Sequence, residues 1–219
     1  MSDKLPSPRS VRDEMERIYT EMSLADIPWN IESPPGQLVD LVASGQVQPC
    51  RTIDVGCGAG NQAIYLASRG FDVTGVDVAA AAIALARDNA RSKGVKCEFV
   101  VADLLDGPGD FTETFEFAHE WSVLHHIYPE TRARHVDTVR RMLTHGGKYF
   151  SACFSDKDPS FNGDGNIRRT PIGTVLYFSS VAELRELFEP HFHVLTMETA
   201  EVEGKTGPHL MNVALMKAR

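Results

Sequence analysis

Short apolar runs alternate along the chain with segments whose apolar residues recur at helical spacing. From their length and their β-branched or aromatic content, strands are predicted at 52–55, 71–76, 96–101, 115–119 and 147–154. Helices are predicted between them at 61–68, 79–93 and 129–144. Regular alternation of this kind predicts a parallel α/β sheet with right-handed crossovers and helices on both faces.

The segments ahead of the first strand predict an appendage to this sheet. A helix is expected over 10–22, where Ser10 resembles the start of a capping box. Several prolines then indicate a loop, which a short helix over 37–44 follows. We therefore expect an N-terminal helix and lid-like segment at 1–36, ahead of a single domain at 37–219.

The pattern changes near the carboxyl end of the chain. Residues 155–177 combine several Gly and Pro with weak periodicity, which predicts a long connection of the kind that often carries function. A helix is predicted from Ser180, and strands at 191–199 and 209–217 form a closing hairpin. The expected fold is a seven-stranded sheet in the order 3-2-1-4-5-7-6, with its last strand antiparallel.

Composition narrows the functional classes. The chain has 219 residues and is 42% hydrophobic, and this length and composition fit one globular domain. Its net charge is −8, and the sequence lacks the dense basic patch of a nucleic-acid binder. Its four cysteines are far apart and form no C-x-x-C pair, so neither a disulfide framework nor a zinc knuckle is expected. The longest apolar run, 78–86, is too short to span a bilayer, and the N-terminus lacks the apolar core of a signal peptide. A cytoplasmic protein that acts on a small molecule is expected.

A glycine-rich turn follows the first predicted strand. Gly56, Gly58 and Gly60 alternate with other residues directly after Asp54, and such a turn needs positive φ and close backbone approach. A dinucleotide-binding turn reads G-x-G-x-x-G, but Asn61 occupies the place of its third glycine here. The spacing therefore favours an adenosyl ligand that lacks a pyrophosphate.

Two further acids stand at strand ends, where parallel strands bring their side chains to one edge of a sheet. Asp77 ends the predicted strand over 71–76, and Asp103 follows the strand over 96–101. Ligands of open α/β sheets bind at this edge, so these acids and the glycine turn predict one site. The alternative for each acid is a simple helix cap.

These motifs in this order resemble the class I S-adenosylmethionine-dependent methyltransferases. The motifs that carry the resemblance are Ile53-Asp-Val-Gly-Cys-Gly-Ala-Gly60, Gly75-Val-Asp77, Ala102-Asp103-Leu104 and Leu143-x-x-Gly146-Gly147. The resemblance covers about residues 37–219 and implies a Rossmann-like fold with S-adenosylmethionine as cofactor. Pro28-Trp29-Asn30 and the segment from Val123 to Ile127 also look similar to small microbial thiopurine and tellurite-resistance methyltransferases.

The resemblance assigns a role to each residue of the motifs. It implies that the backbone of Gly56 and Gly58 passes the methionyl part of the cofactor, close to the start of the helix over 61–68. The other implied cofactor contacts are Asp54 at the methionyl amine, Asp77 at the ribose hydroxyls, Asp103 at the adenine amine, Val78 and Leu104 beside the ring, and Glu120 on the methionyl side.

His125 and His126 are the candidate catalytic residues. They follow the strand over 115–119, and histidine titrates in the range that suits a general base. Structural packing or helix capping is the alternative for both, and His119 fits a core residue better than a metal ligand. Trp29 is expected either to fold over the cofactor as a lid or to anchor the N-terminal helix. No metal site is expected.

The predicted function is methyl transfer to the sulfur, oxygen or nitrogen of a small molecule. Alternatives are a nicotinamide-dependent oxidoreductase on a similar sheet, and a non-catalytic module that only binds S-adenosylmethionine. Methylation of nucleic acid is disfavoured, because Glu120-Trp-Ser-Val replaces the Asn/Asp-Pro-Pro-Tyr motif and the net charge is negative. No motif names the acceptor or the oligomeric state.

Overall fold

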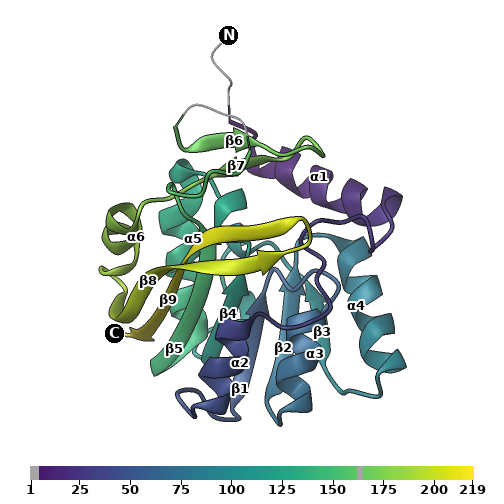
Figure 1. Ribbon diagram of the computed structural model, residues 1–219. Helices are drawn as coiled ribbons and strands as arrows, with labels where there is room; N and C mark the ends of the chain where they lie inside the picture. The colour runs from purple at the N-terminus through teal and green to yellow at the C-terminus, as the bar shows by residue number, and fades with distance from the viewer. Residues whose placement is uncertain (1–4, 162–164) are drawn as a thin grey trace.

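A seven-stranded sheet forms the centre of the computed structural model, which describes residues 5–161 and 165–219 (Figure 1). The parallel strands are β1 (Arg51–Val55), β2 (Asp72–Asp77), β3 (Glu98–Val101), β4 (Phe115–Trp121) and β5 (Leu143–Phe154). The closing hairpin consists of β8 (Phe192–Gly204) and β9 (Gly207–Ala218), and β9 runs antiparallel to β5. The order β3-β2-β1-β4-β5-β9-β8 confirms the predicted one, because β8 and β9 are the sixth and seventh strands of this sheet.

Helices cover both faces of the sheet, as predicted. On one face lie α2 (Gly36–Ala43), α3 (Asn61–Ser68) and α4 (Ala80–Ser92). On the other lie α5 (Pro129–Met142) and α6 (Val181–Phe188). Because both faces are covered, the central strands are buried almost throughout, and this explains their continuous apolar runs.

Helix α1 (Pro8–Glu21) lies outside these layers, at the end of the sheet where α4 begins (Figure 1). It buries Met15, Ile18 and Tyr19 in a small cluster with residues of α4 and with Ile27. The helix was predicted correctly, but its cap was not: Ser7 is the N-cap and accepts the Ser10 N–H at 3.2 Å. Pro8 at the first helical position makes this earlier start favourable. Residues 1–4 of the predicted N-terminal segment lie outside the described residues.

The long connection after β5 contains a second, two-stranded sheet that the sequence did not predict. Strands β6 (Ile167–Arg169) and β7 (Val175–Tyr177) pair as a hairpin beside α1 (Figure 1). Strands of three residues are too short to show a period, and long-range contacts hold them in place. The Arg168 guanidinium lies 4.1 Å from the ring centre of Phe178 and donates to the backbone carbonyl of Ser160 at 2.9 Å. Arg168 is therefore engaged in structural contacts, and residues 162–164 lie outside the described part of the connection.

Two general findings concern the described residues only. None of their helices is long and apolar enough to cross a membrane. The four cysteines, Cys50, Cys57, Cys97 and Cys153, are free thiols in the structure.

Candidate active site

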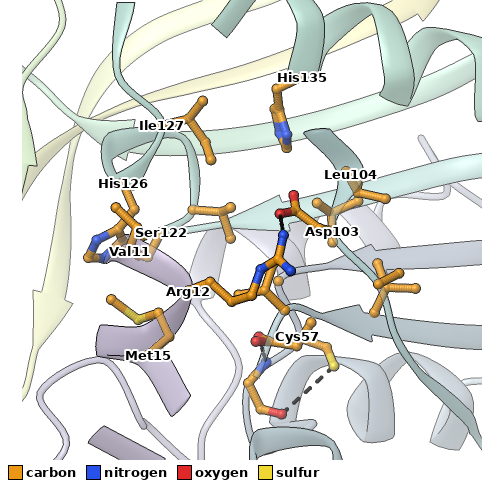
Figure 2. Close-up of a pocket in the computed structure, with 18 of the residues that line it drawn as sticks. Val11, Arg12, Met15, Cys57, Asp103, Leu104, Ser122, His126, Ile127 and His135 are labelled. Carbon is orange, nitrogen blue, oxygen red and sulfur yellow. Dashed lines mark hydrogen bonds and ion pairs between the residues drawn. The ribbon is translucent and has the colours of Figure 1, made fainter. Parts of the chain in front are cut away.

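A cavity of about 150 Å³, which we call the first cavity, lies at the carboxyl ends of the central strands and under α1. Figure 2 shows part of its lining, with α1 on one side and the segments that follow β3 and β4 on the other. Eight of the predicted site residues line it: Trp29, Gly56, Gly58, Asp77, Val78, Asp103, Leu104 and His126. Three predicted site residues do not: Asp54, Glu120 and His125.

The glycine turn between β1 and α3 has the backbone that its sequence predicts. Gly56 and Gly58 have φ angles of 64° and 53°, in the left-handed region that favours glycine. A Cβ built on Gly58 would lie 2.5 Å from the Tyr19 hydroxyl, and one on Gly56 would overlap Val123. These glycines therefore also make room for side chains from α1 and from the segment after β4.

The end of the turn has two different roles. A Cβ on Gly60 would lie 3.0 Å from both Ala86 and Phe99, so this glycine permits the close packing that the third glycine gives in a dinucleotide motif. Asn61, which stands at that third place, donates instead to the Asn30 side chain at 2.9 Å and to the Ile31 carbonyl at 3.2 Å. Asn61 therefore fastens the N-terminal segment to the start of α3.

Asp77 is buried at the end of β2, lines the first cavity and accepts a hydrogen bond from the glycine turn. One carboxylate oxygen accepts the Gly58 N–H and the other accepts the Ala79 N–H, both at 2.9 Å. Burial raises the pKa of Asp77 to about 6, although these two hydrogen bonds act in the opposite direction. The contact with Ala79 is a local one just before α4, whose N-cap is Ala79 and not Asp77, and the contact with Gly58 orders the glycine turn.

Asp103 follows β3 and lines the first cavity where α1 approaches. One of its oxygens accepts the Leu105 N–H at 2.9 Å, as the cap of a short 3-10 helix. The other forms an ion pair with Arg12 of α1, which crosses the cavity in Figure 2. Leu104 and Val78 add apolar surface nearby. The carboxylate that the resemblance assigns to adenine is thus paired with a side chain of α1.

Trp29 lies between α1 and the histidine pair. Its Nε1 donates to the Tyr19 hydroxyl at 2.9 Å, and its ring meets that of His126 edge to face at a centroid distance of 5.8 Å. Lys205, at the tip of the β8–β9 hairpin, holds the preceding loop by donating to the carbonyls of Leu24, Ala25 and Ile27 at 2.7 to 3.1 Å. Trp29 therefore has the contacts of an anchor and also forms part of the cavity wall.

A larger cavity adjoins the first. This second cavity encloses about 660 Å³ and lies between the N-terminal loop, the β6–β7 hairpin, the segment after β4 and the tip of the β8–β9 hairpin. The two cavities share five lining residues: Trp29, Gln62, Trp121, Ser122 and His126. We call this set the junction. A ligand in one cavity would meet a ligand in the other at this point.

The two histidines occupy different places around the junction. His126 lines both cavities, and among the described residues its ring nitrogens have no hydrogen-bond partner. Burial lowers the pKa of His126 to about 4, so the ring is neutral at pH 7 and can accept a proton. His125 lines only the second cavity and accepts the Phe154 N–H at Nδ1, 3.4 Å away, and burial lowers its pKa as well. A neutral His125 then carries its proton on Nε2, which makes it a donor there.

Strand β4 contributes one member to each of two buried acid–histidine pairs, Glu120 with His135 of α5 and His119 with Asp54 of β1. The Glu120 carboxylate accepts from His135 Nε2 at 2.5 Å and from Ser151 at 3.1 Å. Burial favours a higher pKa for Glu120, but the charge and the hydrogen bond of His135 outweigh it and hold the pKa below its ordinary value. One Asp54 oxygen lies 2.7 Å from His119 Nδ1, while the other has no partner among the described residues. The cofactor contacts expected of Asp54 and Glu120 stay predictions.

The sequence analysis missed several cavity residues. Arg12, Met15 and Tyr19 all line the first cavity from α1, and their spacing of three and four places them on one helix face. That spacing was a usable signal, since the helix itself was predicted. His135 also lines the cavity, but nothing in the local sequence distinguishes it from other polar residues of α5.

The side chains that could bind a metal ion do not cluster in the described part of the chain. Within residues 5–161 and 165–219, no group of three or more His, Cys, Asp or Glu side chains has the arrangement needed to hold a metal ion. His119, which sequence analysis weighed as a ligand together with the histidine pair, is buried and faces Asp54.

Comparison with known proteins gives the class of the fold and the family that this chain resembles. The model of the family described as "Methyltransferase domain" matches residues 53–147, from β1 to the start of β5. A 2-heptyl-1-hydroxyquinolin-4(1H)-one methyltransferase from Mycobacteroides abscessus is 30% identical over 150 residues, which cover 66% of this chain and 65% of that protein. The sheet is therefore that of the Rossmann-like methyltransferases. Over this region the chain is similar to the class I S-adenosylmethionine-dependent methyltransferases, and it spans 65% of the length of that relative.

Solved structures share the whole fold. One similar structure concerns the conversion of a disulfide bond into a thioacetal group during echinomycin biosynthesis. Its TM-score is 0.81 at 22% identity, and the match covers 94% of this chain and 92% of that one. The 1,6-didemethyltoxoflavin-N1-methyltransferase of Burkholderia thailandensis has a TM-score of 0.76 at 19% identity, covering 100% and 93%.

TehB from Haemophilus influenzae has a TM-score of 0.67 at 17% identity, covering 94% of this chain and 67% of that one. At identities below 25%, these structural matches show a common fold. The family match does not favour the nicotinamide alternative.

Proposed function

We propose that this protein transfers a methyl group from S-adenosylmethionine to a sulfur, oxygen or nitrogen nucleophile of a small molecule. The observation that supports this most is the pair of adjoining cavities: the first holds the glycine turn with Asp77 and Asp103, and the second meets it at the junction. The relative from M. abscessus is named for a small heteroaromatic acceptor, and the B. thailandensis structure contains S-adenosylhomocysteine. These similarities support a small-molecule acceptor for this protein as well.

The residues of the first cavity fit the chemistry of this cofactor. The Asp77 carboxylate can accept two hydroxyl protons from a ribose, and Asp103 can accept from an adenine amine. The N-terminus of α3 offers free N–H groups to a carboxylate, beside the backbone of Gly56 and Gly58. Asp54 does not line the cavity, but one of its oxygens has no partner among the described residues and would suit an amino group that reached it. When bound, S-adenosylmethionine supplies a methyl group that is already activated on a sulfonium.

We also propose that helix α1 controls access to the first cavity. A cavity of about 150 Å³ is smaller than the roughly 300–1,000 Å³ of typical small-molecule sites. Arg12 and Tyr19 occupy part of the space, next to Asp103 and Gly58. We therefore expect α1 and the loop with Trp29 to move outward when the cofactor enters, and then to exclude water from it.

The chain contributes to the reaction mainly by alignment. The junction residues would hold the acceptor atom in line with the sulfonium and keep water out, which is most of what this transfer needs. His126 is the proposed general base for an acceptor that arrives protonated, because its ring lines both cavities at the junction, although burial makes it a weaker base than an exposed histidine. A phenol, with a pKa of about 10, needs this help more than a thiol, with a pKa of about 8.5.

Calorimetry with S-adenosylhomocysteine tests the proposal. We expect the protein to bind it, and Asp77→Ala to weaken binding at least about 100-fold, or roughly 3 kcal/mol. Asp72→Ala is the matched control, since Asp72 is the exposed first residue of the same strand. Thermal unfolding of both variants shows whether the fold is intact. The assignment is wrong if the unaltered protein does not bind, or if a folded Asp77→Ala binds equally well.

A further inference from the structure

The second cavity points to a chemical class of acceptor. We propose that it takes an uncharged, flat, largely apolar ring compound that carries the accepting atom at one edge. This inference rests on the proposed function, because it places that atom at the junction. The sequence named no acceptor, since the walls come from four segments that are far apart in the chain.

The size and lining of the cavity support this class. A volume of about 660 Å³ is within the roughly 300–1,000 Å³ of small-molecule sites and exceeds what a simple thiol or an oxyanion needs. Aromatic rings stand at several points of the wall, among them Trp121, Phe154 and His209. Phe154 and His209 meet edge to face at a centroid distance of 5.1 Å. Flat rings pack well against such surfaces by stacking and edge contacts.

The charges around the cavity disfavour an anionic acceptor. Among the described lining residues Lys205 is the one cation, and its ammonium group donates to three backbone carbonyls of the N-terminal loop. Two acids, Glu201 and Glu203, stand near the same hairpin tip. A carboxylate or phosphate entering the cavity would lose its hydration without gaining a free cation, which is costly.

Several polar side chains of the wall are engaged with one another. The Thr170 and Thr174 hydroxyls lie 2.7 Å apart and bond to each other, and His209 Nδ1 lies 3.0 Å from the Ser160 hydroxyl. Near the junction lie Gln62, Ser122 and the two histidines, and burial keeps both histidine rings neutral at pH 7. Uncharged polar groups thus face the end of the cavity where the accepting hydroxyl, thiol or amine would lie.

A matched set of naphthols tests the class. The probes are 2-naphthol, 6-hydroxy-2-naphthoate, which is an anion, and 6-(aminomethyl)-2-naphthol, which is a cation. Each is titrated into the protein with S-adenosylhomocysteine bound and, separately, without it. We expect 2-naphthol to bind the loaded protein at least tenfold more tightly than the anion and the cation, and methyl transfer from S-adenosylmethionine to follow the same order.

Variants of the cavity wall locate the binding. Ile172, at the turn of the β6–β7 hairpin, lines the second cavity but not the first. Ile172→Asp should weaken 2-naphthol binding at least tenfold, while Ile172→Val should change it less than threefold. Both should bind S-adenosylhomocysteine like the unaltered protein. Because Ile172 also packs near α1, the same comparison is made with Ile31→Asp and Ile31→Val, on another part of the wall.

Each outcome is decisive. The inference is overturned if the anion or the cation binds as tightly as 2-naphthol, if none of the three binds the loaded protein, or if both Asp variants fold and bind 2-naphthol unchanged. Failure of S-adenosylhomocysteine binding in the unaltered protein contradicts the proposed function instead. The titrations without cofactor then report on the cavity alone.

Discussion

The two cavities are built in different ways. Much of the first comes from short, contiguous motifs at strand ends, in which the glycine turn, Asp77 and Asp103 follow β1, β2 and β3. The second is lined by the N-terminal loop, two hairpins and the segment after β4, which only the folded chain brings together. A feature of the shared fold can be recognised from its motif, whereas a cavity specific to this chain has to be read from the structure.

The sharpest test of the boundary between the cavities concerns His126, which lines both. His126→Asn should lower kcat about 100-fold for a phenolic acceptor, because a general base contributes roughly 10²–10⁴-fold. S-adenosylhomocysteine affinity should not change. The measurements are steady-state kinetics and calorimetry, with the exposed His145→Asn as control. An unchanged kcat would leave His126 a structural residue of the junction.

A second test disturbs the first cavity and leaves the second intact. Gly58→Ala adds a methyl group 2.5 Å from the Tyr19 hydroxyl, at a φ of 53°. Backbone strain costs about 1–2 kcal/mol and the contact adds to it, so both stability and cofactor affinity should fall. Gly94→Ala is the control for strain alone, since its φ is 64° and nothing lies within 4 Å.

The partner substitution Tyr19→Phe removes the clashing oxygen. In a Tyr19→Phe background, Gly58→Ala should therefore cost less stability, as measured by denaturant unfolding of the four proteins in the cycle. Equal costs for Gly58→Ala and Gly94→Ala would mean that α1 does not rest on the glycine turn in solution.

The smallest expected effect is a difference in pH dependence between ligand binding in the first cavity and ligand binding in the second. Asp77 has a pKa of about 6, and its carboxylate form is the one that accepts hydroxyl protons. As the pH falls below about 6 the carboxyl is protonated, so affinity for S-adenosylhomocysteine should weaken by up to about tenfold per pH unit. Calorimetry from pH 5 to 8 measures this. Binding of 2-naphthol should stay constant over that range, because His126 remains neutral down to about pH 4. Asp77→Asn should flatten the cofactor profile, and a slope that persists in this variant would assign the titration to another group.

Sequence reasoning succeeded where the information is local. The alternating periods predicted the parallel sheet, the closing hairpin fitted the strand order that the structure has, and the positive φ angles of Gly56 and Gly58 followed from a turn that only glycine adopts easily. It failed for β6 and β7, whose three residues each show no period, and for the cap of α1. It also could not show that Asn61 tethers Asn30, since that contact spans 31 residues of chain.

The sequence by itself therefore indicated the resemblance to a family, the parallel sheet and the side chains gathered at its carboxyl edge. These depend on backbone preferences and on alternation along the chain, which are local properties. Only the tertiary structure decided that Arg12 pairs with Asp103, that Lys205 holds the N-terminal loop and that a mainly apolar second cavity opens at His126. Such contacts join residues far apart in the chain, and burial, which sets the pKa of Asp77 and of His126, exists only once the layers have packed.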